Sequence, residues 1–310
     1  LVMLDQSEWA LYEINREMVG QSTGIPLRPV IADITNAERM EAGFAQERPE
    51  VVIHAAGRVS VFGKGDELTM RVNYEGTRNM VDACKGKRLS KFVYVSSVDA
   101  LCQRKHEEIK APSSFDPSLA KGVYGKSKAL ASDYVLASSK SGFPGIVVCP
   151  SALLGPLDPG HSPMNEAFLK FIQGKIPVLT KGGYDVVDSR DVATGILKAA
   201  DKGKDGETYL LTGHRVSVRE LFSSFSKASG RKPPKITLPF FLLSIIAPIV
   251  EIGGKIRKKN PLFSPLAIDL LKINPLYSNK KSLDGLGYGV RPLSETIEDT
   301  YAYLESRLWP

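Results

Sequence analysis

The sequence predicts an α/β fold in which a doubly wound parallel sheet carries helices on both faces. Strand-like apolar runs alternate with helical segments through the first two thirds of the chain, as in a sheet with crossover helices. Several of these runs end in small or polar residues, at the edge where such sheets bind ligands. A chain of 310 residues with 43% hydrophobic and 24% charged residues is ordinary for a soluble globular protein.

The first two predicted strands are short apolar runs that end in aspartates. Residues 1–4 precede Asp5, and residues 29–32 precede Asp33. The other predicted strands of this part are apolar runs that end in small, hydroxyl or proline residues: 51–57, 91–97 and 145–149. Helical spacing predicts the helices between the strands: 7–18, the stretch from Asp33 through Ala45, 73–83 and 124–138.

The strict alternation of strands and helices stops at Pro150, after which prolines and glycines become denser. We therefore expect a sheet domain over residues 1–150 and a smaller lobe over residues 151–310. Residues 185–203, a strand-like run followed by a helical one, are expected to return to the sheet domain.

A tyrosine and a lysine on one predicted helix are the strongest catalytic candidates. Tyr124 and Lys128 share a helix face, so their polar ends can point into one cleft, whereas Lys126 points elsewhere. A nearby cation favours the phenolate, and this makes a phenol of ordinary pKa about 10 usable as a general acid or base. A strand ending in Ser96 and Ser97 comes before this helix, and a serine there can bind a substrate oxygen. The alternative is that both hydroxyls cap the next segment.

Charge and metal-ligand patterns argue against several other classes of protein. The net charge is +7, with basic clusters at 231–235 and 255–259, but no nucleic-acid motif accompanies them, so we expect no nucleic-acid partner. The histidines and three cysteines form no metal-ligand pattern, which predicts no metal site and reduced thiols in a cytoplasmic protein. The apolar stretch 236–252 is too short to span a membrane. We expect it to form a helix over the substrate pocket, and peripheral membrane contact is the less favoured alternative.

Several strings along almost the whole chain, in a fixed order, together resemble the extended short-chain dehydrogenases/reductases. They are HAAG at 54–57, NYEGTRN at 73–79, FVYVSS at 92–97, YGKSK at 124–128, CPS at 149–151, LGP at 154–156, VDSRDVA at 187–193, YLLTG at 209–213, LGY at 286–288 and RPL at 291–293. Within that superfamily, residues 50–308 are most similar to the dihydroflavonol reductase and 3β-hydroxysteroid dehydrogenase branch. This branch is widely labelled NAD-dependent epimerase/dehydratase.

The resemblance implies a fold and a set of catalytic residues. It makes residues 1–150 an NAD(P)-binding Rossmann-type domain and residues 151–310 a substrate-binding lobe. It implies that Tyr124 is the catalytic acid and base, and that Lys128 is its electrostatic partner and a ligand of the nicotinamide ribose. Ser97 would orient the substrate carbonyl, and Asn73 would support the site from a helix. The resemblance also implies a small-molecule substrate and a homodimer formed through two helices of each subunit.

The resemblance also implies a set of cofactor contacts. Ala55, Ala56 and Gly57 would be small because the cofactor passes close to that strand end. Pro150 and Ser151 would meet the nicotinamide carboxamide. The other implied contacts are Asp5, which would bind the adenosine ribose and so favour NAD over NADP, and Asp33, which would contact the adenine. For both aspartates the alternative is a helix N-cap.

The chain departs from the family at its first residues. A complete member begins with a strand and a Gly-x-x-Gly-x-x-Gly turn that binds the cofactor pyrophosphate, and neither precedes Leu1 in this sequence. The glycines at 253–254 and 285–289 do not follow a strand and open a helix as that turn does. Because the strand in question is central in this fold, we expect its two neighbours to lack a partner, which puts NAD affinity in doubt.

The expected reaction is hydride transfer between NAD(P) and a carbonyl or secondary alcohol of a bulky small molecule. The first alternative is a nucleotide-sugar epimerase or dehydratase, because the opening residues resemble sugar dehydratases and Asp99 follows Ser97 closely. Asp99 is the lone carboxylate there, and it is either a base or a turn residue. The second alternative is a catalytically inactive nucleotide-binding fragment.

Overall fold

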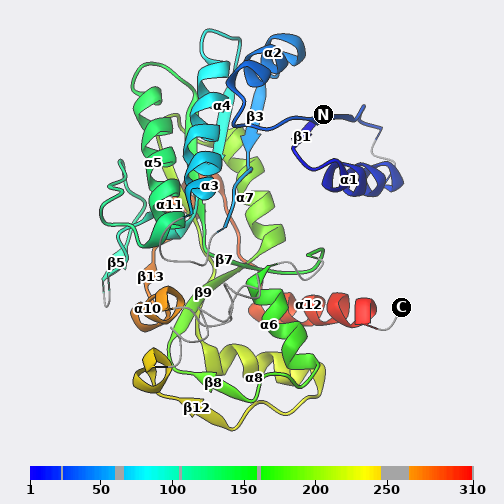
Figure 1. The fold of residues 1–310 in the computed structure, drawn as a ribbon, viewed down its shortest axis with the longest axis vertical. Coiled ribbons are helices and arrows are strands. Elements are labelled where there is room, and N and C mark those ends of the chain that lie inside the picture. Colours follow the sequence, from blue (N-terminus) through cyan, green and yellow to red (C-terminus); the bar gives the residue numbers. More distant parts are fainter. Residues whose placement is uncertain (22–23, 60–65, 105–106, 159–161, 246–264, 309–310) are drawn as a thin grey trace.

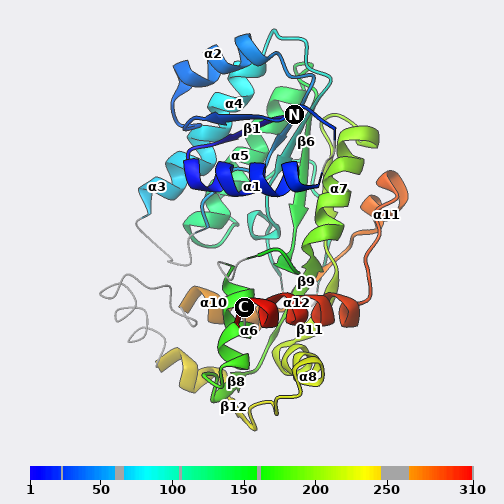
Figure 2. The ribbon, with the colours of Figure 1, turned by 90° about the vertical axis from the view of Figure 1, so that its right-hand side faces the viewer.

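The computed structural model describes residues 1–21, 24–59, 66–104, 107–158, 162–245 and 265–308 (Figure 1). A layered α/β part forms one end of the molecule and a smaller lobe forms the other. Figure 2 shows the two parts one above the other, with helix α12 (Leu293–Leu308) running across between them. The basic cluster 255–259 lies outside the described residues.

The α/β part is built on a four-stranded parallel sheet with the order β10-β6-β4-β3. Its strands are β3 (Val51–His54), β4 (Lys91–Val95), β6 (Gly145–Pro150) and β10 (Thr208–Leu211). The helices packed on it are α4 (Gly76–Cys84), α5 (Gly122–Ser139), α7 (Ser189–Lys202) and α11 (Lys280–Leu286). The sequence therefore predicted the fold class correctly.

Alternate side chains of the central strands enter two separate cores. Phe92 and Tyr94 on β4 pack with α4 and α5, whereas Val93 between them packs with α7 and α11 on the opposite face. Ile146 and Val148 on β6 share the core of Val93. Because both faces are covered, these strands are continuous apolar runs rather than alternating ones.

The first two strands form a small sheet of their own. β1 (Val2–Asp5) pairs in parallel with β2 (Arg28–Ile31), and α1 (Glu8–Gly20) and α2 (Ala37–Glu47) follow them. Within the described residues, β1 pairs only with β2, and β3 pairs only with β4. Val51 and Ile53 on β3 are 47% and 42% exposed. In the described part of the chain, β1 and β3 thus share no strand partner, and the expectation that a strand is missing between them stays a prediction.

The smaller lobe is assembled from segments that follow Pro150. Its strands are β7 (Ala152–Leu154), β9 (Gly183–Asp188) and β11 (His214–Ser217) in one sheet, and β8 (Val178–Thr180) and β12 (Ile236–Leu238) in another. Its helices are α6 (Pro163–Ile172), α8 (Val218–Ser229), α10 (Pro265–Ile273) and α12. Phe168 of α6 stacks on Phe225 of α8 with ring centroids 3.9 Å apart. The chain returns to the central sheet through α7, β10 and α11.

Two local predictions differ from the structure. The helix expected over 73–83 starts earlier, at α3 (Glu67–Met70), and passes through a π-helical turn, η1 (Arg71–Glu75), before α4. The prediction of a single helix over 236–252 is wrong at its start, because β-branched residues and Pro239 favour a strand there and β12 pairs with β8. Helical backbone follows at 240–245, and 246–252 lie outside the described residues. Among the helices that the structure describes, none is long and apolar enough to cross a membrane.

A buried carboxylate connects the two parts. Asp188, at the N-cap of α7, has a fully buried side chain and accepts hydrogen bonds from the Arg190 backbone, 2.8 Å, and guanidinium, 2.8 and 3.0 Å. Arg190 also binds Asp299 on α12 at 2.7 Å. Burial alone would raise the pKa of Asp188, but the hydrogen bonds from Arg190 outweigh it and hold the pKa below its ordinary value.

We expect this carboxylate to stabilise the fold at neutral pH and to lose that effect in acid. Because the folded-state pKa of Asp188 is lowered, its contribution is complete above the unfolded-state pKa and disappears as the pH falls through the folded-state value. Asp188→Asn should therefore lower the unfolding free energy by about 1–3 kcal/mol at pH 7 and by less at pH 3. Asp269→Asn, at an exposed ion pair with Lys272, is the control for thermal unfolding across pH. An equal effect of Asp188→Asn at both pH values would contradict the prediction.

Candidate active site

The candidate catalytic side chains meet at the carboxyl ends of β3, β4 and β6. Tyr124 and Lys128 lie on α5, which packs against the short 3-10 helix η2 (Val98–Ala100) that follows β4. Asn73 enters from the π-helical turn η1, which also packs on α5. Ligands bind at this edge of doubly wound sheets.

Lys128 is held inside the protein and points at the strand ends. The residue is 4% exposed. Its Nζ donates to the carbonyl of Val95 at 2.8 Å and lies 4.9 Å from the centre of the Tyr94 ring. A Cβ atom on Gly57 would stand 3.0 Å from the same Nζ. Burial lowers the pKa of Lys128 to about 8. The lysine is therefore a fixed cation beside the carboxyl end of β3.

Asn73 joins three backbone segments of the site. Its Oδ1 accepts from the backbone N–H of Arg58 at 2.7 Å, and its Nδ2 donates to the Arg58 carbonyl at 3.0 Å and to Ser127 Oγ at 2.9 Å. Ser127 in turn donates to the carbonyl of Tyr124 at 2.8 Å. A π-helical turn, which is frequent at functional sites, places the amide at this junction.

The two serines at the end of β4 have different partners. Ser132 on α5 donates to the carbonyl of Lys128 at 2.7 Å, so the hydroxyl of Ser96, 2.7 Å away, must donate to Ser132. Ser97 caps η2, and its Oγ accepts from the backbone N–H of Asp99 at 3.1 Å. Ser97 therefore caps η2 as the alternative proposed, whereas Ser96 does not cap it but binds Ser132 instead.

Tyr124 keeps its proton at neutral pH. Burial, and after it the charge of Asp99, raise the pKa of the phenol above its ordinary value, although hydrogen bonding with the Ser97 side chain opposes them. The Lys128 ammonium is directed at the Val95 carbonyl. The expectation that this lysine favours the phenolate stays a prediction.

A glycine lets the catalytic helix approach η2. A Cβ atom on Gly125 would lie 2.5 Å from the backbone oxygen of Asp99, a separation that real Cβ atoms do not show. Gly125→Ala should therefore push α5 away from η2 and lower the unfolding free energy by about 1–3 kcal/mol.

The matched control for Gly125→Ala is Gly43→Ala on α2, where an added Cβ meets nothing within 4 Å. We expect this control to stabilise the helix by about 0.5–1 kcal/mol. Chemical unfolding of both variants measures the difference. Equal stability of the two would show that α5 and η2 are not in tight contact.

Neither aspartate of the predicted cofactor site caps a helix. Asp5, exposed at the end of β1, accepts from the N–H of Ser7 at 2.8 Å, and Ser7 is the N-cap of α1. Asp33 accepts from the N–H of Thr35 at 2.8 Å, and Asn36 is the N-cap of α2. The N-cap alternatives are therefore wrong, because each aspartate closes a turn ahead of the capping residue.

Three small residues follow β3 at its carboxyl end. Ala55 and Gly57 are exposed and Ala56 is partly exposed, while Pro150 and Ser151 at the end of β6 are buried beside β10. An NAD molecule can approach the backbone closely at such small residues. Because Gly57 has no Cβ, its backbone can lie close to the Lys128 ammonium. These residues fit the nicotinamide half of the cofactor.

Two neighbours of the site were missed by the sequence. Gln103 donates to Asp99 Oδ1 at 3.1 Å, and burial raises the pKa of that carboxyl despite this bond. Tyr277 arrives from far along the chain because β13 (Leu276–Tyr277) pairs with β5 (Glu108–Ile109). Burial, and then the charges of Asp99 and Asp185, raise the pKa of Tyr277 above its ordinary value. No local pattern marks Tyr277, whereas Asp99 and Gln103 are four residues apart.

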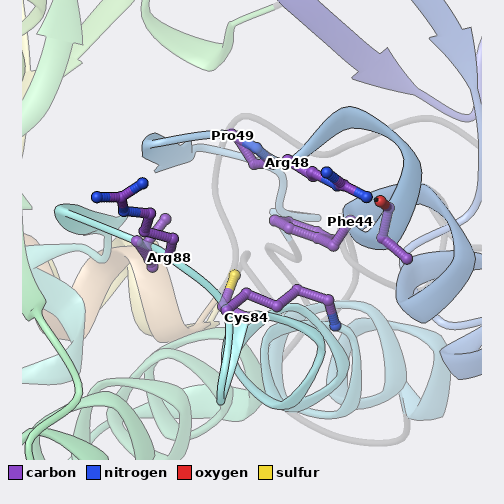
Figure 3. A pocket seen from close by; sticks show the side chains of 8 residues that line it. Phe44, Arg48, Pro49, Cys84 and Arg88 are labelled. Atoms are coloured by element: carbon purple, nitrogen blue, oxygen red, sulfur yellow. Dashed lines mark hydrogen bonds between the residues drawn. The ribbon is translucent and has the colours of Figure 1, made fainter.

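A surface cavity lies away from the candidate catalytic residues. It has a volume of about 340 Å³ and is bounded by the end of α2, the start of β3 and the end of α4 (Figure 3). Phe44, Arg48 and Pro49 line one side of it, and Cys84 and Arg88 line the other. It is therefore at the amino end of the strands, opposite the candidate catalytic residues, and contains none of them. Within the described residues, no three His, Cys, Asp or Glu side chains are grouped as a metal site.

The fold is of the doubly wound α/β class, and the candidate residues lie at the sheet edge where such folds bind ligands. The model of the NAD dependent epimerase/dehydratase family matches residues 3–212. The chain belongs to this family, which lies within the extended short-chain dehydrogenases/reductases, and NAD is the family's cofactor.

Relatives and solved structures agree with this assignment. A putative dihydroflavonol 4-reductase of Synechocystis is 25% identical over 91% of this chain and 83% of its own length. The 3beta-hydroxysteroid-dehydrogenase/decarboxylase isoform 1 of Arabidopsis thaliana is 28% identical over 91% of this chain and 68% of its own. The crystal structure of gox2253 superposes with a TM-score of 0.80 and 26% identity, over 99% of this chain and 90% of that one. UDP-glucuronic acid 4-epimerase from Bacillus cereus shares the fold, with a TM-score of 0.73 and 18% identity over 99% of this chain and 91% of that one.

Proposed function

We propose that this enzyme transfers a hydride between NAD and the carbonyl or secondary alcohol of a bulky small molecule, with Tyr124 as general acid and base. The observation that carries the proposal is the junction of Tyr124, Lys128 and Asn73 at the carboxyl end of β3. Relatives named as a dihydroflavonol reductase and hydroxysteroid dehydrogenases support an oxidoreductase of this kind.

NAD supplies or accepts the hydride when it is bound. Gly57, Ala55 and Lys128 would hold its nicotinamide ribose, and Asp5 would bind the adenosine ribose through a carboxylate that repels the 2′-phosphate of NADP. This contact is geometrically available, because Asp5 is exposed at the carboxyl end of β1.

The side chains move one proton in each direction of the reaction. In reduction, the phenol of Tyr124 donates its proton to the substrate oxygen, and the Ser97 hydroxyl donates a hydrogen bond to the same atom. In oxidation, the phenolate takes the proton of the alcohol. A phenol that stays protonated at neutral pH is suited to the reductive direction.

The experiment that tests the proposal is a cofactor balance. A flavanonol, a 3-ketosteroid and UDP-glucuronic acid are each incubated with the enzyme and NADH or NAD, and product is compared with the change in absorbance of NADH. We expect one NADH consumed for each molecule of a carbonyl compound reduced. Conversion of the UDP-sugar without net change in NADH would establish the epimerase alternative instead, which the shared fold of the epimerase structures keeps open.

A further inference from the structure

We infer that His54 is a positioning residue that holds the Asn73 junction in place through Thr77. This inference rests on the proposed function, since it assigns a second layer of support to the same site. The juxtaposition that carries it is a series of hydrogen bonds from the end of β3, through the backbone carbonyl and the side chain of Asn73, to the helix that bears Tyr124 and Lys128.

The series begins at the imidazole of His54. His54 Nε2 lies 2.9 Å from Thr77 Oγ1, and Thr77 Oγ1 donates to the carbonyl of Asn73 at 2.6 Å. A threonine hydroxyl has one proton, so the proton between His54 and Thr77 must come from the imidazole. The ring is therefore the Nε2–H tautomer and acts as a donor.

The histidine stays neutral because of its surroundings. It is 2% exposed, and its ring lies 5.5 Å from the ring of Tyr94 and 6.0 Å from that of Phe92. Burial, and then the charge of Lys128, lower the pKa of His54 to about 3. The donor role is consequently fixed over the whole pH range in which the enzyme can work.

The bond to the Asn73 carbonyl lies at the π-helical turn. Asn73 is part of that turn, and the Thr77 hydroxyl, four residues further on, gives its carbonyl a side-chain donor. The side-chain amide of Asn73 then binds the backbone N–H and the backbone carbonyl of Arg58, which follows the cofactor-facing Gly57. It also binds the Ser127 hydroxyl on α5. A shift of Thr77 would therefore move the strand end and the catalytic helix relative to each other.

Two variants at one position separate positioning from packing. His54→Gln keeps an N–H donor near the position of Nε2, whereas His54→Leu has a similar volume and no donor. Phe92→Leu is the packing control. The Phe92 ring lies beside that of His54, but it has no group that could hydrogen-bond Thr77. We expect His54→Leu to lower kcat about 10- to 100-fold, His54→Gln to restore most of it, and Phe92→Leu to lower Tm without this loss of kcat.

A second measurement does not depend on turnover. Hydrogen–deuterium exchange of the Arg58 amide, which donates to Asn73 Oδ1, should become faster in His54→Leu than in His54→Gln or Phe92→Leu. Equal exchange at Arg58 in all three variants would overturn the positioning role. If the three variants show this exchange pattern but the wild-type enzyme has no Tyr124-dependent turnover, the proposed function fails while the role of His54 in holding the junction stands.

Discussion

Tyr124→Phe should lower the rate of hydride transfer by about 10²- to 10⁴-fold, since positioned general acid catalysis contributes effects of that size. The substitution removes one oxygen from a side chain on α5 and leaves the ring. Because the backbone carbonyl of Tyr124 rather than its phenol accepts from Ser127, the junction with Asn73 should be retained. NADH binding and Tm should change little.

The control for this variant is Tyr134→Phe on the same helix. The Tyr134 hydroxyl donates to Asp82 at 2.6 Å, on the face of α5 away from Ser97. Stopped-flow absorbance of NADH measures the hydride step directly for both variants. Retention of more than about a tenth of the rate in Tyr124→Phe would remove the tyrosine from the reaction, because a lost general acid should have a larger effect.

Lys128→Met should lose activity and gain stability. The pKa of Lys128 is lowered from 10.5 to about 8, so keeping the buried ammonium charged at pH 7 opposes folding. Methionine removes this charge, but it also leaves the carbonyl of Val95 without its donor. We expect a net increase in the unfolding free energy of about 1–2 kcal/mol, or about 2–4 °C in Tm, at pH 7.

The gain in stability has a defined pH dependence. The folded-state pKa lies below the unfolded-state value, so the unfolded chain binds more protons between about pH 8 and 10.5. The unfolding free energy of the wild type should therefore rise relative to that of Lys128→Met as the pH rises through this interval. Lys126→Met, exposed on the same helix, is the control and should change neither activity nor this pH dependence. A Lys128→Met protein less stable than wild type at pH 7 would contradict the account.

The catalytic candidates could be predicted because each depends on a short spacing. Tyr124 and Lys128 share a helix face because they are four residues apart on one helix. The parallel sheet brings the carboxyl ends of 51–57 and 91–97 together. The apolar runs, buried on two faces, also predicted β3, β4 and β6 of the central sheet, whereas its fourth strand, β10, was not among the predicted strands.

Features that arise from distant pairing or exact helix geometry could not be predicted. Tyr277 reaches the site only because β13 pairs with β5, and no pattern near it indicates that pairing. The π-helical turn that aims Asn73 depends on packing against α5, since the local sequence is compatible with an ordinary helix. Ser7 and Asn36, rather than Asp5 and Asp33, cap the helices. A turn separates each strand end from its helix, so the N-cap comes two residues after Asp5 and three after Asp33.

The most direct test of the central claim is calorimetric binding of NADH. The chain as given is compared with a version that carries a strand and a Gly-x-x-Gly-x-x-Gly turn ahead of Leu1. The added strand could pair with the edges of β1 and β3 that no described strand covers. We predict that the extended version binds NADH more tightly, and that Lys128→Met weakens this binding whereas Lys126→Met does not. If neither version binds NADH, the site built from Gly57, Lys128 and Tyr124 is not a nicotinamide site, and the proposed reaction is wrong.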